Sequence, residues 1–158
     1  MIPYIPPSGM LAAVLISAAI LCGHFLLIHR ARGTGLDPTV AAGFSASMLT
    51  GGLLFGHWVK LLYVPGAWET IQSHPSVLWS IFRGQASFGG LLGALLGGLA
   101  YLRWKRQDRA SVLRWFDQIA LVFPYAWVLG RMNCAVMHDH PGIRTTSWIG
   151  VRYPDGVR

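Results

Sequence analysis

GMLAAVLISAAILCGHFLLI, residues 9–28, is the stretch of sequence that decides the fold class. Its length matches the ~20 apolar residues that an α-helix needs to cross the hydrocarbon core of a bilayer. His24 is the one side chain in it that can carry a full positive charge. A run this long and this evenly apolar does not suit a buried strand of a soluble protein. The sequence therefore predicts a membrane-spanning helix at this position.

Three further apolar stretches follow, at roughly 40–62, 86–102 and 112–136. The composition agrees with a membrane protein, because 53% of the residues are hydrophobic and 12% are charged, against about 25% charged in a typical soluble domain. We predict an all-α membrane protein with about four transmembrane helices in a single polytopic domain, residues 1–158. Residues 137–158 then form a tail on the outer side of the membrane.

The formal net charge of +7 raises the question of a nucleic-acid partner. The basic residues, however, stand between the long apolar stretches. In that setting they indicate membrane topology and contacts with anionic lipid headgroups. We therefore expect no nucleic-acid partner.

The positions of the basic residues predict that the N-terminus lies outside. Arg30 and Arg32 follow the first span, and a denser basic loop follows the third. Short basic loops stay on the cytoplasmic side. The loop between the second and third spans carries Arg83 as its one basic residue, so we expect it outside, with Trp68 and Trp79 as interface anchors. The head MIPYIPPSG has no positive charge, which favours a retained helix over a cleaved signal peptide.

Small residues recur along the predicted helices. Gly89, Gly93 and Gly97 repeat every four residues in the third span. This spacing lets two helix backbones approach closely in a membrane. We therefore expect a packing role for most of these glycines.

The stretch GRMNCAVMHDHPG, residues 130–142, places charged and imidazole side chains at the end of the last span. Arg131 is the first candidate for binding, since an arginine at membrane depth normally faces a cavity or a partner. Its planar fork of donors suits a phosphate or a carboxylate. The alternative is that Arg131 extends to the lipid headgroups without binding a ligand.

His138, Asp139 and His140 are the second set of candidates. A zinc ion would need a third and a fourth ligand, and none stands at the usual spacing, so we predict no metal. A histidine paired with an aspartate can instead serve as an oriented general base. The alternative is a solvated loop that ends the helix at Pro141 and Gly142.

Three more polar residues lie near the ends of predicted helices. Asp117 falls in the first turn of the last span, where a carboxylate complements the helix dipole, and we expect a structural role. His57 and Lys60 end the second span. They could line a cavity shared with Arg131, but we favour side chains that extend to the interface.

Three ordered motifs resemble one family of membrane enzymes. FRGQASFGGLLG is similar to a Trp-x-Gly-Gly-Met-Ser-x-His-Gly-Gly segment, and FDQIALVFPYAWVLGRMN to a series of Asp, Pro and Gly-Arg-x-Gly-Asn. HPGIRTTSWIGVRYPDGVR is similar to the segment that follows this arginine. The family is that of the prolipoprotein diacylglyceryl transferases, and the likeness is best over residues 80–158. The matching positions are Gly84, Gly89, Gly90, Gly93, Asp117, Pro124, Gly130, Arg131, Gly142, Thr145 or Thr146, Trp148, Pro154 and Gly156.

The resemblance implies a reaction, two substrates and a location. The family moves the diacylglyceryl group of phosphatidylglycerol to the thiol of the lipobox cysteine in a prolipoprotein signal peptide, in the bacterial inner membrane. Glycerol phosphate leaves, and no cofactor is needed. Arg131 would bind the phosphate, with glycines 89, 90 and 142 at the substrate. We expect His138, Asp139 and His140 to help form the thiolate.

The chain also departs from the family's pattern. Phe88 stands where the family has a histidine, and Cys134 and Met137 stand where it has asparagines, whereas Asp139 keeps the charge of a glutamate. The likeness corresponds to the first half of the family's length. Two alternatives therefore stay open. One is a family member that binds phospholipid or lipoprotein without catalysis, and the other is a small structural or metal-handling membrane protein.

Overall fold

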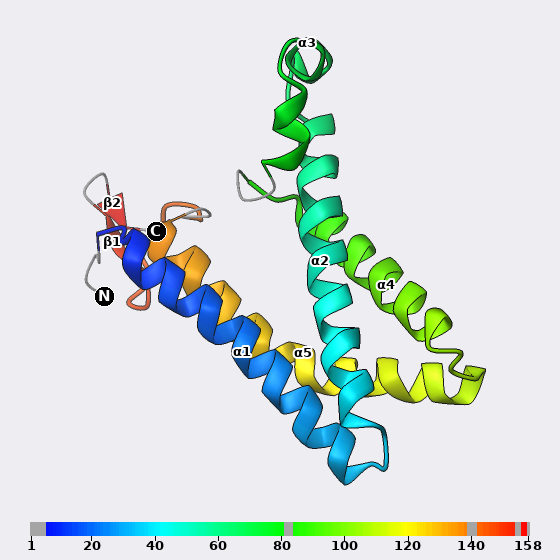
Figure 1. The fold of residues 1–158 in the computed structure, drawn as a ribbon. Coiled ribbons are helices and arrows are strands. Elements are labelled where there is room, and N and C mark those ends of the chain that lie inside the picture. Colours follow the sequence, from blue (N-terminus) through cyan, green and yellow to red (C-terminus); the bar gives the residue numbers. More distant parts are fainter. Residues whose placement is uncertain (1–5, 81–83, 139–141, 154–155, 158) are drawn as a thin grey trace. The chain divides into compact units, whose positions relative to one another are not determined.

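The computed structural model describes residues 6–80, 84–138, 142–153 and 156–157 (Figure 1). Five α-helices, one short 3-10 helix and a two-stranded hairpin make up this described part of the chain. They follow in the order α1 (Gly9–Gly33), α2 (Pro38–Leu62), α3 (Ala67–Ser73), η1 (Pro75–Trp79), α4 (Ser87–Trp104), α5 (Arg109–Met137), β1 (Arg152–Tyr153) and β2 (Gly156–Val157).

Among the helices in the described part of the chain, α1, α2 and α5 are long and apolar enough to cross a membrane. The helix α4 is 18 residues long, about 27 Å at 1.5 Å per residue, which is close to the ~30 Å of a hydrocarbon core. It is not among the helices that combine the length and the apolarity of a span, and it carries Arg103 in its last turn. The chain is an all-helical membrane protein apart from its two-residue strands, as predicted. Three of the four predicted spans, those of α1, α2 and α5, have the length and apolarity that crossing a membrane requires. The helix α4 stays a predicted span.

The end of α1 and the start of α5 differ from the predicted ends of the first and last spans. The helix α1 continues to Gly33, so that Arg30 and Arg32 lie in its last turn, where cations complement the helix dipole. The helix α5 begins at Arg109, because the carboxylate of Asp108 accepts a hydrogen bond from the Ser111 N–H (3.2 Å). Asp117 is therefore not in the first turn, and the prediction that placed it there is wrong.

The start of α2 is fixed by Asp37. Its carboxylate accepts hydrogen bonds from the backbone N–H and the hydroxyl of Thr39, both at 2.8 Å. Pro38 follows at the first helical position, where its fixed φ suits a helix and its missing N–H costs nothing. The bond from the Thr39 N–H, and then the one from its hydroxyl, lower the pKa of the Asp37 carboxyl.

The chain groups into two compact units. One comprises Met1–Leu26 and Ala120–Arg158, and the other comprises Leu27–Ile119. Both boundaries fall inside the continuous helices α1 and α5. The prediction of a single domain, residues 1–158, stays a prediction.

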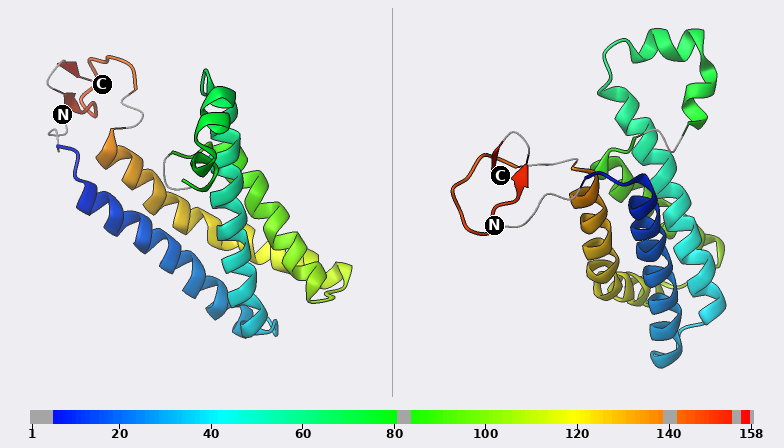
Figure 2. Two further views of the ribbon diagram at one scale, coloured as in Figure 1. Left: turned by 45° about the horizontal axis from the view of Figure 1, so that its top comes forward. Right: turned by 90° about the vertical axis from the view of Figure 1, so that its left-hand side faces the viewer.

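A seam of glycines joins α2 to α4 in the second unit, and both views of Figure 2 show these helices side by side. A Cβ on Gly89 would lie 2.6 Å from the carbonyl oxygen of Phe55 and 2.6 Å from Cβ of Val59. A Cβ on Gly98 would lie 2.6 Å from the ring of Phe44. The predicted packing role of the glycines is thus confirmed, with α2 as the partner helix.

An aromatic cluster packs the first turns of α2 against the start of α5 in the same unit. The buried ring of Phe44 packs against Trp115 (centroids 5.6 Å apart) and edge-on against Phe116 (5.7 Å). The guanidinium of Arg30 donates to the side-chain oxygen of Gln118 (2.9 Å). These contacts tie the end of α1 to the start of α5, and the start of α5 to α2.

In the first unit, α1 lies beside the later part of α5 (Figure 2). A Cβ on Gly23 of α1 would touch Cβ of Ala126 at 3.4 Å, which is an ordinary contact. Apolar side chains such as Val14, Leu21 and Phe25 stay exposed along α1. Exposed apolar side chains along a spanning helix are the expected surface toward lipid tails.

Candidate functional site

Arg131 lies near the C-terminal end of α5, with its side chain exposed. Within the part of the chain that the structure describes, it makes no hydrogen bond or ion pair. A guanidinium fork held on a helix and open to an incoming anion is suited to bidentate binding of phosphate. Its role in substrate binding stays a prediction.

His138 ends α5 with a left-handed backbone, φ 57°. Histidine is among the residues that adopt this conformation more often than most. Its N–H reaches back to the carbonyl oxygen of Ala135 (3.4 Å). The chain therefore turns sharply at the residue that the sequence analysis predicts to be catalytic.

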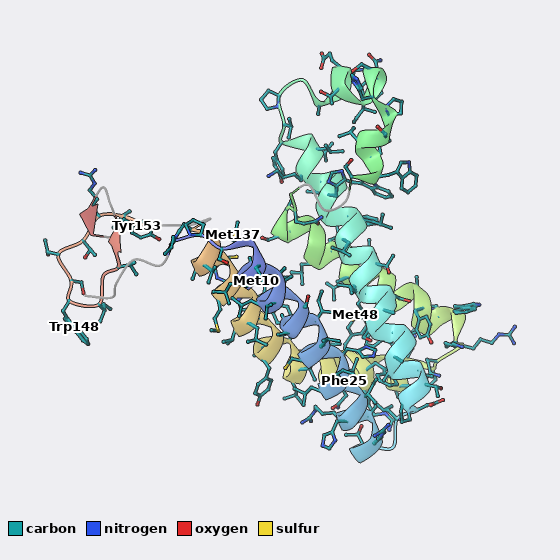
Figure 3. All side chains as sticks on the ribbon, turned by 60° about the vertical axis from the view of Figure 1, so that its left-hand side comes forward. Met10, Phe25, Met48, Met137, Trp148 and Tyr153 are labelled. Atoms are coloured by element: carbon teal, nitrogen blue, oxygen red, sulfur yellow. The ribbon has the colours of Figure 1, made fainter. Side chains whose placement is uncertain are left out.

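Tyr153 is the described partner of this histidine. Nδ1 of His138 lies 2.9 Å from the Tyr153 hydroxyl, and the two rings meet edge to face with centroids 5.0 Å apart. Tyr153 belongs to β1 and pairs with Gly156 of β2 in an antiparallel register. Figure 3 labels Tyr153 on this hairpin and Met137 at the end of α5. The hairpin thus brings the tail back to the end of the helix.

The arginine and the histidine are separated by about two helical turns, or ~10 Å along the axis. Seven positions of an α-helix return to nearly the same side, so the two backbone positions share one side of α5.

The hydrogen bond at His138 has two possible directions, because a hydroxyl both donates and accepts. When the imidazole donates from Nδ1 to the Tyr153 oxygen, Nε2 carries the lone pair that can accept a proton. This is the arrangement of a histidine base oriented by a second group. The histidine and tyrosine therefore suit proton transfer from a thiol.

Asp139 and His140, the other two predicted catalytic residues, lie outside the described residues. Gly142, on the far side of that gap, has φ +77°, a conformation that favours glycine. No group of three or more His, Cys, Asp or Glu side chains among the described residues could hold a metal ion. The catalytic roles of the His-Asp-His stretch stay predictions.

Gly89 and Gly90, which the sequence analysis expects at the substrate, belong to the other unit. Gly89 is buried against the backbone of α2, as described above. A Cβ on Gly90 would meet nothing closer than the Gly52 carbonyl oxygen, at 3.7 Å. Close packing explains Gly89, whereas the space beside Gly90 is compatible with a substrate role.

Two residues of this chain have contacts that sequence reasoning missed. Tyr153 carries no signal for this contact in the sequence, because it stands in a short tail segment without helical or strand periodicity. His57 was expected at the interface but is 1% exposed, with Nε2 2.7 Å from the carbonyl oxygen of Val77. The signal for its burial is the neighbouring Gly56, which lets the 84–86 segment approach and the Ala86 N–H donate to the Gly56 carbonyl (2.9 Å).

These features define a multi-pass helical membrane protein with an arginine and an oriented histidine at the end of its last described helix. The sequence profile of the family described as prolipoprotein diacylglyceryl transferase matches residues 11–157. The chain belongs to this family.

Curated relatives agree with the family. The phosphatidylglycerol–prolipoprotein diacylglyceryl transferase of Xanthomonas euvesicatoria pv. vesicatoria is 31% identical over 150 residues, which cover 92% of this chain and 47% of the relative. The phosphatidylglycerol–prolipoprotein diacylglyceryl transferase 2 of Clostridium perfringens is 29% identical over 143 residues, which cover 89% of this chain and 53% of the relative. That of Symbiobacterium thermophilum is 26% identical over 146 residues (92% and 53%). The chain spans about half the length of the curated relatives it matches. No solved structure matches it significantly.

Proposed function

We propose that this protein transfers the diacylglyceryl group of phosphatidylglycerol to the thiol of a lipobox cysteine in a prolipoprotein signal peptide. The observation that carries the proposal is Arg131, an exposed guanidinium on α5 within the region that matches the transferase family. We propose the bacterial inner membrane as its location, which agrees with three helices long and apolar enough to cross a membrane. The substrates named in the relatives' descriptions are the ones proposed here.

The reaction is a substitution at carbon. The cysteine thiolate attacks the glyceryl carbon that carries the phosphate ester, a carbon–sulfur bond forms, and the carbon–oxygen bond to phosphate breaks. The electron pair leaves with glycerol phosphate. Arg131 stabilises the charge that develops on this leaving group, since a cation aimed at developing charge contributes most in the transition state.

The thiol proton needs an acceptor, because the thiolate is the nucleophile. We propose His138, with Asp139 and His140 beside it in the sequence. The 2.9 Å contact between His138 and the Tyr153 hydroxyl supports this role, since it orients the imidazole. Gly90 and Gly142 are proposed at the substrate, where they leave space beside the backbone.

A transfer assay tests the proposed function. The protein is placed in phosphatidylglycerol vesicles with a lipobox peptide, and the peptide's mass is followed. We expect one diacylglyceryl group per cysteine and one glycerol phosphate released per peptide. A matched peptide with serine at the lipobox cysteine should gain nothing. A cysteine peptide whose mass stays unchanged would refute transferase activity for this chain.

A second function is favoured by Phe88. This residue lies in the first turn of α4, is 71% exposed, and stands where the family has a histidine. A family member without that imidazole could bind phosphatidylglycerol and the signal peptide without joining them. Saturable binding of both, with no change in the peptide's mass, is the result that this function predicts.

A further inference from the structure

An apolar groove lies where α2 ends. It has a volume of about 500 Å³ and is formed by the last turns of α2, by α3 and by η1. Figure 1 shows α3 and η1 folded back at this end of α2. The principal side chains in its walls are Trp58, Leu61, Trp68, Ile71 and Leu78. None of these residues has a part in the transferase reaction proposed above.

Two hydrogen bonds hold η1 against α2 and so shape the groove. The His57 imidazole donates from Nε2 to the carbonyl oxygen of Val77 (2.7 Å), since a carbonyl can only accept. The Trp58 indole N–H donates to the carbonyl oxygen of Leu78 (3.2 Å). The His57 side chain that makes the first of these bonds is buried, so the attachment of η1 to α2 is part of the fold of this segment.

The lining has the wrong charge for a phosphate. Glu69 supplies a carboxylate, and no lysine, arginine or histidine belongs to the lining among the described residues. Phosphate recognition needs cationic donors. The groove therefore suits a hydrocarbon rather than a lipid headgroup or another anion.

Continuity with the membrane identifies the source of that hydrocarbon. The helix α2 is one of the apolar spanning helices, and its last turns form one wall of the groove. In the lining, Leu62 and Trp68 are 81% and 67% exposed, and Trp79, which follows the lining residue Leu78, is 72% exposed. Tryptophan gathers at the boundary between hydrocarbon and headgroups. An exposed apolar surface at this depth meets lipid tails rather than water.

We propose that this groove binds an acyl-chain segment of a neighbouring phospholipid, in the leaflet where α2 ends. The segment from Val64 to Trp79 then lies in the interface, with Trp68 and Trp79 at headgroup level. The inference depends on the membrane class of the protein and is independent of the transferase reaction.

Site-directed spin labelling tests this inference. Cys22 and Cys134 are first replaced by alanine, and a nitroxide is attached at Ile71→Cys, inside the groove, or at Gln72→Cys, the exposed neighbour outside it. The protein is placed in vesicles of phosphatidylethanolamine and phosphatidylglycerol. Relaxation by oxygen, which dissolves in hydrocarbon, is compared with relaxation by a water-soluble nickel complex.

We expect the ratio of oxygen to nickel accessibility to be several-fold higher at Ile71→Cys than at Gln72→Cys. Equal nickel accessibility at both positions would overturn the proposal, because the groove would then hold water. Shielding of position 71 from both reagents would also overturn it, because another protein surface, including a second copy, would then cover the groove.

A second measurement avoids a label inside the groove. Phospholipid spin-labelled on its acyl chain shows a motionally restricted component where it contacts protein. We expect Ile71→Asp to lower the number of restricted lipids per protein and Gln72→Asp to leave it unchanged. The same number in both variants would contradict an acyl-chain site.

Discussion

The backbone at His138 and its described contact with Tyr153 set the position of the candidate base. Its left-handed φ ends α5, and the Tyr153 hydroxyl at 2.9 Å sets the plane of its imidazole. Neither feature is visible in the sequence. The two residues are 15 positions apart, and the residues between them lack the periodicity that predicts a contact. The candidate base was thus predictable by residue type, whereas its orienting partner was not.

Replacing Tyr153 by phenylalanine removes that hydroxyl while keeping the ring. We expect the transfer rate to fall about 3- to 10-fold, since a net hydrogen bond contributes roughly 0.5–1.5 kcal/mol. The maximal rate should fall while the peptide concentration at half-maximal rate stays the same. Tyr63→Phe, an exposed tyrosine beyond the end of α2, is the control. Equal rates for Tyr153→Phe and the unaltered protein would contradict the orienting role.

Asp37 provides a test of pH dependence at the start of α2. Its folded-state pKa is lowered by the hydrogen bonds from the Thr39 N–H and hydroxyl. Its stabilising contribution is therefore complete above the ordinary pKa of about 3.9 and is lost as the pH falls through the folded-state value. We expect Asp37→Ala to melt at a lower temperature than the unaltered protein near neutral pH, and the difference to shrink on acidification.

Thermal melting in detergent micelles measures this difference. Asp117→Ala removes an exposed carboxylate from the interior of α5 and should change the melting temperature little at any pH. A difference for Asp37→Ala that grows on acidification would have the wrong sign for this cap.

At the scale of the elements, the sequence predicted the long helices well because they must satisfy the bilayer. The apolar stretches had to be helical, since every backbone polar group in lipid needs an internal partner. The spacing of Gly89, Gly93 and Gly97 predicted close packing but could not name α2 as the partner. The start of α5 was misplaced, because apolarity marks the start of a span, whereas a cap such as Asp108 marks the start of the helix. The short elements α3 and η1 escaped prediction because they lie in a Trp- and Pro-rich loop without a clear period.

Adjacent glycines in α4 allow a matched test of packing against substrate binding. A Cβ on Gly89 would lie 2.6 Å from the Phe55 carbonyl oxygen, whereas one on Gly90 would lie 3.7 Å from its nearest neighbour. Overpacking typically costs about 1–3 kcal/mol. We expect Gly89→Ala to lower the melting temperature clearly and Gly90→Ala to preserve it.

The transfer rate separates the two roles further. If Gly90 lies at the substrate, Gly90→Ala should lower the transfer rate without lowering the melting temperature. A Gly89→Ala protein as stable as the unaltered one would refute the packing account of the α2–α4 seam.

For the whole molecule, the placement of charge predicts how the chain crosses the membrane. Basic residues gather at the helix ends and in the connections where α1 meets α2 and where α4 meets α5, namely Arg30, Arg32, Arg103, Lys105, Arg106 and Arg109. The α2–α4 connection carries Arg83 as its one Lys or Arg. Single cysteines at Thr34 and Ser76, both exposed, test this after Cys22 and Cys134 are replaced by alanine. We expect a membrane-impermeant maleimide to label Ser76→Cys in intact cells with a permeabilised outer membrane. Thr34→Cys should react only after the inner membrane is disrupted, and the reverse pattern would contradict the predicted orientation.

The central claim is that Arg131 binds the phosphate that leaves during diacylglyceryl transfer. Its most direct test is the rate of thioether formation on a lipobox peptide by Arg131→Gln, compared with the unaltered protein in the same phosphatidylglycerol vesicles. Arg114→Gln, an exposed arginine near the other end of α5, is the matched control. We expect Arg131→Gln to be slower by about 10²- to 10³-fold, the effect typical of removing one group that stabilises developing charge, and Arg114→Gln to be unaffected. Equal rates for Arg131→Gln and the unaltered protein would contradict the account.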